Sequence, residues 1–194
     1  SVCSTAAIVL SPLGETIVAA HQIAISVTSQ LFMIPMSLAI ALTIRVGTYY
    51  GEQNWQAMRK VQYLGLITAT ILAILTMILL WVFRNEILAL YTSDMIVTQI
   101  AVYLILFAIA YQLMDAWQIS AAGCLRGMQD TKGPMWITML AYWVIAFPVG
   151  VYLSRFTDMG AAGVWVGLIV GLSVACILLL GRLYGNNKRL SLNN

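Results

Sequence analysis

The fold is decided by the stretch from residue 95 to residue 126, which is MIVTQIAVYLILFAIAYQLMDAWQISAAGCLR. Its first twenty residues, Met95 to Met114, contain no charged side chain. A helix needs about 20 mainly apolar residues to cross a hydrocarbon core of about 30 Å. The stretch therefore predicts a membrane-spanning helix that carries one acidic residue, Asp115, within its length.

The rest of the chain has the same membrane character. Hydrophobic residues make up 61% of it, charged residues make up 9%, and the mean hydropathy is +0.90, whereas a soluble domain has about 25% charged residues. The composition predicts an all-α, polytopic transmembrane bundle with the lipid bilayer as its solvent. Charge-free runs of spanning length predict five full spans at 16–44, 61–83, 95–114, 133–154 and 159–181. The apolar residues 1–10 are too short to cross alone, and we expect them to be the end of a further helix.

The basic residues predict the orientation, because short cytoplasmic loops are enriched in Lys and Arg. Alternate connections lie on opposite sides, and eight of the ten basic residues fall on the side of the carboxyl terminus. We therefore expect a cytoplasmic tail. Gly163, Gly167 and Gly171 are spaced four apart, and this face predicts close helix packing. Pro148 and Pro35 lie inside spans, where they are either kinks that act as hinges or prolines tolerated by packing.

Asp115 lies deep in its predicted helix. Arg126, taken as the membrane-surface end, follows eleven residues later, or about 16 Å at about 1.5 Å per residue. Near the middle of the membrane an aspartate costs roughly 2.5 to 3.5 kcal/mol on insertion scales, and such acids usually mark ion or proton pathways. Because burial disfavours the charged form of a carboxyl group, Asp115 could exchange a proton or trade it for a bound cation. The alternative is a structural role in helix packing.

The neighbours of Asp115 favour a polar site. Tyr111 lies one turn earlier on the same face, and Gln112 and Gln118 flank that face. A phenol and two carboxamides could donate to the carboxylate or help to coordinate a cation. On the span 16–44, Gln30 and His21 are further candidates for lining a cavity, although a His near a helix end is also typical of an interfacial side chain.

Other kinds of site are not supported. The sequence has one His and no HExxH, no G-x-S-x-G elbow and no glycine-rich phosphate loop. Its three Cys have no metal-type spacing, and its net charge of +3 forms no basic stripe for nucleic acid. We therefore predict no enzymatic activity, no cofactor and no metal beyond a sodium ion at Asp115.

Several segments occur in a fixed order along the chain: GETIVAAHQIA at 14–24, MIPMS at 33–37, IRVG at 44–47, YQLMD at 111–115, AAGCLRG at 121–127 and DTK at 130–132. Together they resemble the multidrug and toxic-compound extrusion (MATE) family, in its NorM-type bacterial branch. That family implies twelve membrane helices in two six-helix lobes around a central cleft. On its map the chain is the carboxy-terminal lobe with its first helix truncated, and the missing amino-terminal lobe is its partner. The segments would be the end of helix seven (1–11), helices eight to twelve (16–44, 61–83, 97–125, 134–154, 160–182) and a cytoplasmic tail (183–194).

The resemblance also implies antiport of cationic, amphiphilic drugs and dyes against sodium or protons, across a bacterial inner membrane. Asp115 matches the family's acidic residue on the tenth helix, and Tyr111 matches a tyrosine implicated in cation binding. One feature departs from the family: its further cation-binding carboxylate on helix seven has no counterpart in residues 1–11. Because that acid and the other lobe are missing, we do not expect the chain alone to transport.

Two alternatives remain open on the sequence. A lipid-linked saccharide flippase of a related branch would share the architecture but have a more basic cleft, and the few basic residues within the spans speak against it. A non-transporting membrane component that packs against a partner would fit the glycine face, although that face does not require a partner.

Overall fold

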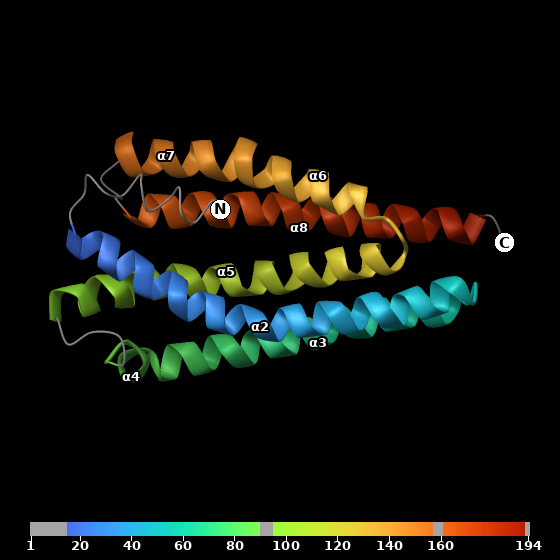
Figure 1. The fold of residues 1–194 in the computed structure, drawn as a ribbon, viewed down its shortest axis with the longest axis horizontal. Helices are drawn as coiled ribbons and strands as arrows, with labels where there is room; N and C mark the ends of the chain where they lie inside the picture. The colour runs from blue at the N-terminus through green and yellow to red at the C-terminus, as the bar shows by residue number, and fades with distance from the viewer. Residues whose placement is uncertain (1–14, 90–94, 157–160, 193–194) are drawn as a thin grey trace.

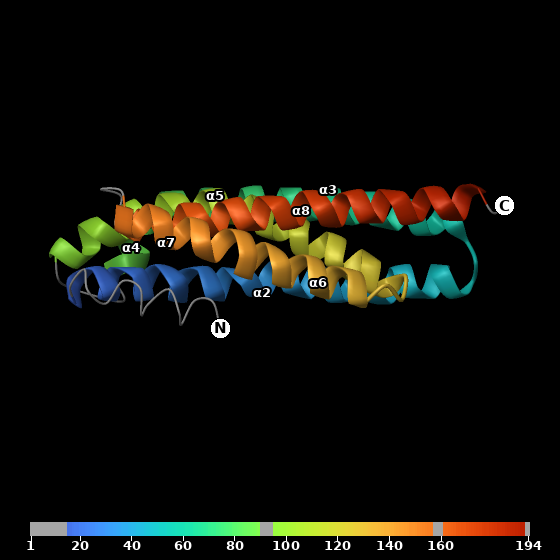
Figure 2. The same ribbon diagram turned by 90° about the horizontal axis from the view of Figure 1, so that it is seen from above.

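The computed structural model of the chain describes residues 15–89, 95–156 and 161–192, and every regular element within these ranges is a helix. Figures 1 and 2 show the helices lying side by side along one axis of an elongated bundle. Of the described helices, five are long and apolar enough to cross a membrane. The predicted all-helical membrane bundle with five spans is therefore confirmed. The predicted helix end at residues 1–11 lies outside the described residues.

The helix α5 is the centre of the bundle. It contacts α2, α3, α4, α6 and α8, and it carries Asp115, so the other helices form the walls around this residue. The elements are α2 (Glu15–Gly51), α3 (Trp55–Val82), α4 (Arg84–Ala89), α5 (Met95–Gly127), α6 (Lys132–Leu140), η2 (Ala141–Ala146), α7 (Phe147–Phe156) and α8 (Ala161–Leu192). Together α6, η2 and α7 form one continuous span.

The helices extend beyond the apolar spans that the sequence predicts. The helix α2 continues past residue 44 to Gly51, and α8 continues past residue 182 to Leu192. Hydropathy marks only the part of a helix that lies in hydrocarbon, whereas backbone hydrogen bonding continues into the headgroup region. Residues 183–192, predicted as part of a tail, are therefore helical. Lys188 and Arg189 suit the negative end of the helix dipole there.

Packing on α3 follows the rules of a protein in lipid. The face of α3 toward the bundle buries small residues such as Gly65, Ala69 and Ala73. The opposite face exposes Ile71 and Ile74, whose side chains are 60% and 48% accessible. Apolar side chains gain little by leaving lipid, so close backbone approach at small residues drives association instead.

The glycine face of α8 packs as the sequence predicts, and the structure identifies the partner. A Cβ added to Gly167 would lie 2.4 Å from the Gly150 nitrogen and 2.7 Å from the Ala146 oxygen, and one added to Gly163 would lie 2.6 Å from the Ser154 nitrogen. The backbones of α7 and η2 therefore touch α8 directly. Only glycine permits this approach.

A wide helical turn precedes Pro148. Residues Ala141–Ala146 form a π-helix, and the Phe147 N–H donates to the carbonyl of Tyr142. In a regular α-helix the Pro148 ring would crowd the carbonyl four residues earlier, and the wider turn relieves this crowding without ending the helix. Single-turn π-segments often occur at functional sites. Tyr142 lies in this one and, as described below, faces the site. Pro35, by contrast, is buried within a continuous α2.

Candidate functional site

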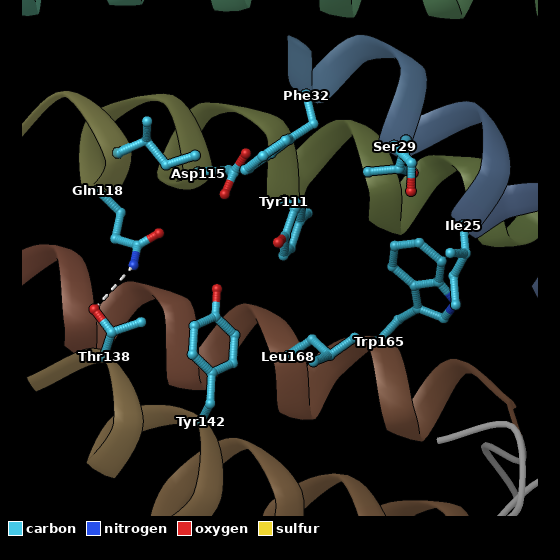
Figure 3. A pocket seen from close by; sticks show the side chains of 12 residues that line it. Ile25, Ser29, Phe32, Tyr111, Asp115, Gln118, Thr138, Tyr142, Trp165 and Leu168 are labelled. Carbon is cyan, nitrogen blue, oxygen red and sulfur yellow. Dashed lines mark hydrogen bonds between the residues drawn. The ribbon is translucent and has the colours of Figure 1, made fainter. Parts of the chain in front are cut away.

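Asp115 is buried at the wall of a cavity inside the bundle. Its side chain is 2% exposed, and the cavity has a volume of about 470 Å³. Figure 3 shows side chains from four spans meeting there. The lining consists of Ile25, Thr28, Ser29 and Phe32 from α2, Tyr111, Asp115, Gln118 and Ile119 from α5, Thr138 and Tyr142 from α6 and η2, and Trp165 and Leu168 from α8.

Aromatic side chains line this cavity close to the Asp115 carboxyl group. Tyr111 lies one turn before Asp115, with its side chain within interaction range of the carboxyl group. Its ring packs edge-on against Trp165, with ring centroids 6.5 Å apart. The Tyr111 and Tyr142 hydroxyls both point into the cavity (Figure 3). Two phenols from different helices are therefore presented to the space in front of Asp115.

The cavity holds a carboxyl group without a basic neighbour. Among its lining residues, all in the described part of the chain, none is Lys, Arg or His. The described ranges also contain no group of three or more His, Cys, Asp or Glu that could hold a metal ion. The polar lining consists instead of hydroxyl and amide groups, whose oxygens suit hard cations such as Na⁺ better than transition metals.

An amide-to-hydroxyl contact crosses the cavity toward the next helix. Gln118 Nε2 donates to Thr138 Oγ1 at 3.5 Å, joining α5 to α6. A second cavity, of about 520 Å³, shares Gln118 and Thr138 with the first and continues along α5 as far as Arg126. A groove thus runs from Asp115 toward the end of α5, and the Gln118–Thr138 pair borders both parts.

The other predicted site residues lie elsewhere. Gln112 is 2% exposed and its Nε2 donates to Thr76 on α3 at 3.4 Å, so it faces away from the cavity. Gln30 lines a separate cavity of about 550 Å³ between α2, α3 and α4. The side chain of His21 lies outside the described residues. Of the three candidate lining residues whose side chains the structure describes, Gln118 borders the Asp115 cavity.

Of the lining residues that were not predicted from the sequence, three carry a hydroxyl or indole group. Thr138, Tyr142 and Trp165 lie on spans other than α5, and each is one residue of an apolar run. The spacing of Thr138 and Tyr142, four apart, places them on one helical face. That pairing of polar groups within a span was the available indication.

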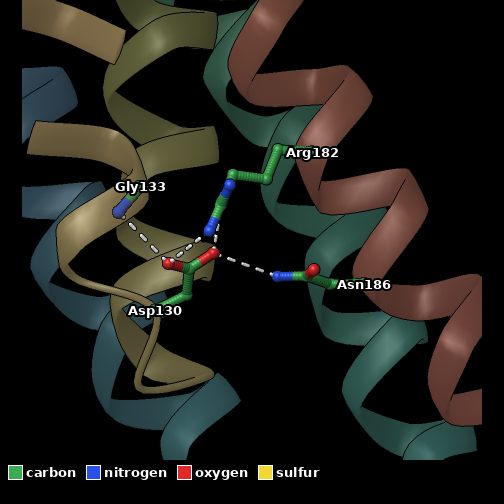
Figure 4. Close-up of polar contacts among 4 residues, drawn as sticks. All are labelled: Asp130, Gly133, Arg182 and Asn186. Atoms are coloured by element: carbon green, nitrogen blue, oxygen red, sulfur yellow. Dashed lines mark hydrogen bonds and ion pairs between the residues drawn. The ribbon is translucent and has the colours of Figure 1, made fainter. Parts of the chain in front are cut away.

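A second carboxylate, Asp130, lies in the turn between α5 and α6. Arg182 donates from Nε at 2.5 Å and from Nη2 at 3.1 Å, and Asn186 Nδ2 donates at 3.1 Å. The Gly133 N–H donates at 3.3 Å. Figure 4 shows these donors converging on the carboxylate from α6 and α8. Hydrogen bonding to Arg182 holds the pKa of Asp130 below its usual range, so this carboxylate is a fixed structural link.

Comparison with known proteins identifies the family of the chain. A family model described as MatE matches residues 4–152. The chain is 72% identical over 191 residues to the probable multidrug resistance protein NorM of Acinetobacter baylyi, a match that covers 98% of the chain and 42% of that protein. It is 41% identical over 189 residues to NorM of Vibrio cholerae, covering 94% of the chain and 41% of that protein. The chain thus spans about two fifths of the length of these relatives.

Solved structures agree on the fold. The chain superimposes with a TM-score of 0.88 on the outward-facing conformation of a multidrug resistance MATE family transporter of the MOP superfamily, at 18% identity, covering 98% of the chain and 42% of that structure. The corresponding inward-facing conformation gives a TM-score of 0.84 at 19% identity, covering 98% and 43%. With its five apolar spans and these matches, the chain is a multi-pass membrane protein that belongs to the MatE family, a family of transporters rather than enzymes.

Proposed function

We propose that the chain is the carboxy-terminal lobe of a twelve-helix exporter that exchanges cationic, amphiphilic drugs and dyes for sodium ions or protons. In this proposal Asp115, with Tyr111, binds the coupling ion. The observation that carries it is the buried carboxyl group of Asp115 in a cavity with hydroxyl, amide and aromatic lining and no basic residue. A charged carboxylate in the membrane interior is costly, so an arriving small cation lowers its free energy.

The two lobes then alternate access by rocking against each other around the site. Ion binding and drug binding favour opposite conformations, so that entry of one drives release of the other. The match to both the outward-facing and the inward-facing structure, at TM-scores of 0.88 and 0.84, supports a lobe that keeps its fold while it moves. A membrane potential adds roughly 2.3 kcal/mol per charge per 100 mV.

The groove along α5 is the proposed route by which the ion reaches the cytoplasm. It leads from the Asp115 cavity toward Arg126. Eight of the ten Lys and Arg residues fall at the connections and terminus on that side, which favours a cytoplasmic location in a bacterial inner membrane. An ion that enters from outside and leaves here would drive drugs in the outward direction.

The complete transporter requires an amino-terminal lobe that this chain does not contain, and we expect the chain alone to be inactive. Relatives named multidrug resistance protein NorM, of which the chain spans about 42%, support drugs as the substrates. The lipid-linked saccharide flippase is less favoured, because a phosphate-bearing substrate needs cationic groups and no described residue that lines the Asp115 cavity is basic.

The test compares two charge-matched variants in the complete transporter, Asp115→Asn and Asp130→Asn. Each replacement removes one carboxylate and keeps its shape. We expect Asp115→Asn to abolish drug efflux driven by a sodium or proton gradient, because the coupling ion loses its counter-charge, and Asp130→Asn to retain it. Drug accumulation in cells and in loaded vesicles measures the outcome. Undiminished gradient-driven efflux in Asp115→Asn would remove this residue from the mechanism.

A further inference from the structure

A separate cavity lies between the first turns of α3 and the last turns of α8. Its volume is about 410 Å³. Its walls include Arg59, Tyr63 and Leu66 from α3 and Leu183, Tyr184 and Lys188 from α8. We propose that this cavity binds the headgroup of one anionic phospholipid of the surrounding membrane. The proposal requires only that the chain lies in a bilayer, so it does not depend on the transport mechanism.

The charge of the cavity favours an anion. Arg59 and Lys188 stand on opposite walls, and no acidic residue belongs to the lining that the structure describes. Within the described ranges the ion pair is Arg182–Asp130, which uses neither cation. A phosphodiester between Arg59 and Lys188 would neutralise both, and a guanidinium offers paired donors to phosphate oxygens. Basic pockets between helices at the membrane surface are typical headgroup sites.

The other lining residues suit a lipid better than a free phosphate ion. The Tyr63 and Tyr184 side chains are 66% and 73% exposed, as is typical of aromatic residues at the level of the headgroups. Ile67 and Ile71 follow Tyr63 at a spacing of four on the exposed face of α3, and Ile177 precedes Tyr184 by two turns on α8. An apolar track therefore leads from the cations toward the membrane interior, where an acyl chain would lie.

A partly buried amide pair links the two walls. Gln62 is 3% exposed, and its Oε1 accepts a hydrogen bond from Asn187 Nδ2 at 2.7 Å. Gln62 Nε2 in turn approaches Met128 Sδ at 3.4 Å. Each amide is adjacent in its helix to one lining cation, because Gln62 lies three residues after Arg59 and Asn187 lies one before Lys188. The spacing of the two helices that carry the cations is thus set before any lipid arrives, which lowers the cost of binding.

The experiment uses the complete transporter in nanodiscs of phosphatidylcholine with a minor fraction of phosphatidylglycerol. Native mass spectrometry counts the phosphatidylglycerol molecules retained after release into detergent. We expect the unaltered protein to retain one, and the double variant Arg59→Gln with Lys188→Gln to bind it about 25-fold more weakly, at about 5-fold per cation. Both cations are exposed, and size-exclusion chromatography checks that the variant is folded.

The chain offers a matched control, Lys60→Gln with Arg189→Gln. These residues are the sequence neighbours of the lining cations, they are exposed, and they do not line the cavity. The proposal expects this control to bind phosphatidylglycerol like the unaltered protein. Equal losses in both double variants would indicate diffuse surface attraction and overturn the proposal, as would no loss in either. Displacement of the lipid by an equal concentration of inorganic phosphate would also overturn it. Because the measurement counts bound lipid, a failure of the proposed transport function would leave its result unchanged.

Discussion

Asp115 and Asp130 lie fifteen residues apart in the sequence and have opposite surroundings. Asp130 accepts hydrogen bonds from Arg182, Asn186 and the Gly133 N–H. Asp115 is 2% exposed and faces a cavity whose described lining has no basic residue. The comparison teaches that an aspartate with a fixed cationic partner links helices, whereas one without such a partner is suited to bind an exchangeable cation.

The contributions of the two aspartates to stability differ in the same sense. The Asp130–Arg182 pair is partly exposed, with side chains 15% and 45% accessible, and such pairs contribute about 1 kcal/mol or less to stability. The pair nevertheless links the start of α6 to α8. It lies directly after Gln129, whose φ of 61° marks a tight turn. An aspartate at the centre of a membrane helix instead costs roughly 2.5 to 3.5 kcal/mol, so a stability argument alone does not account for Asp115.

The largest expected effect comes from giving Asp115 the kind of partner that Asp130 has. Thr138 faces the same cavity from α6, and Thr138→Arg would place a guanidinium there. A fixed cation would occupy the carboxylate and exclude the coupling ion, so we expect gradient-driven efflux to fall about 100-fold or more, since a desolvated charge pair contributes several kcal/mol. Transport in membrane vesicles measures this. Thr138→Gln, which adds bulk and no charge, is the control, and full activity of Thr138→Arg would contradict the comparison.

A smaller effect is expected from a change that weakens ion binding at Asp115 without giving the carboxylate a fixed cationic partner. Tyr111→Phe removes a hydroxyl that lies within interaction range of the carboxyl group and keeps the ring against Trp165. A hydrogen bond to a charged group contributes about 1.5 to 3 kcal/mol, so we expect the apparent affinity for the driving ion to fall at least about tenfold. The concentration of sodium or protons that gives half-maximal efflux is the measurement. An unchanged half-maximal concentration would exclude the Tyr111 hydroxyl from ion binding.

The smallest effect is expected at Asp130 and concerns stability alone. Asp130→Asn should lower the free energy of unfolding by about 1 kcal/mol and leave the driving-ion affinity unchanged. Because Arg182 lowers the pKa of folded Asp130, the folded state binds this proton less tightly than the unfolded state. The stabilisation is thus fully present above the ordinary aspartate pKa of about 3.9 and is lost as pH falls through the lower folded value.

Thermal unfolding in detergent across a pH series checks this prediction. The difference in Tm between the unaltered protein and Asp130→Asn should stay constant from about pH 8 to about pH 5 and shrink below about pH 4. Arg182→Gln should give the same profile, because it removes the same pair. A difference that already disappears near neutral pH would contradict the assigned direction.

Much of the fold follows from the sequence alone, because a membrane helix satisfies its own backbone and must be apolar over a fixed length. The five spans, the place of Asp115 within one of them and the close-packing glycine face of α8 were all predictable in this way. The ends of the helices were not, since α2 and α8 continue into polar sequence where hydropathy no longer distinguishes helix from loop.

The tertiary structure decided which side chains share a site. Gln112 and Gln118 flank Asp115 symmetrically in sequence, yet one contacts α3 and the other α6, because only the packing of neighbouring helices distinguishes the two flanks. It also brought Thr138, Tyr142 and Trp165 to the cavity and paired Asp130 with Arg182 across 52 residues. Sequence periodicity reports the face of a single helix, whereas the partner of that face depends on how separate helices associate in lipid.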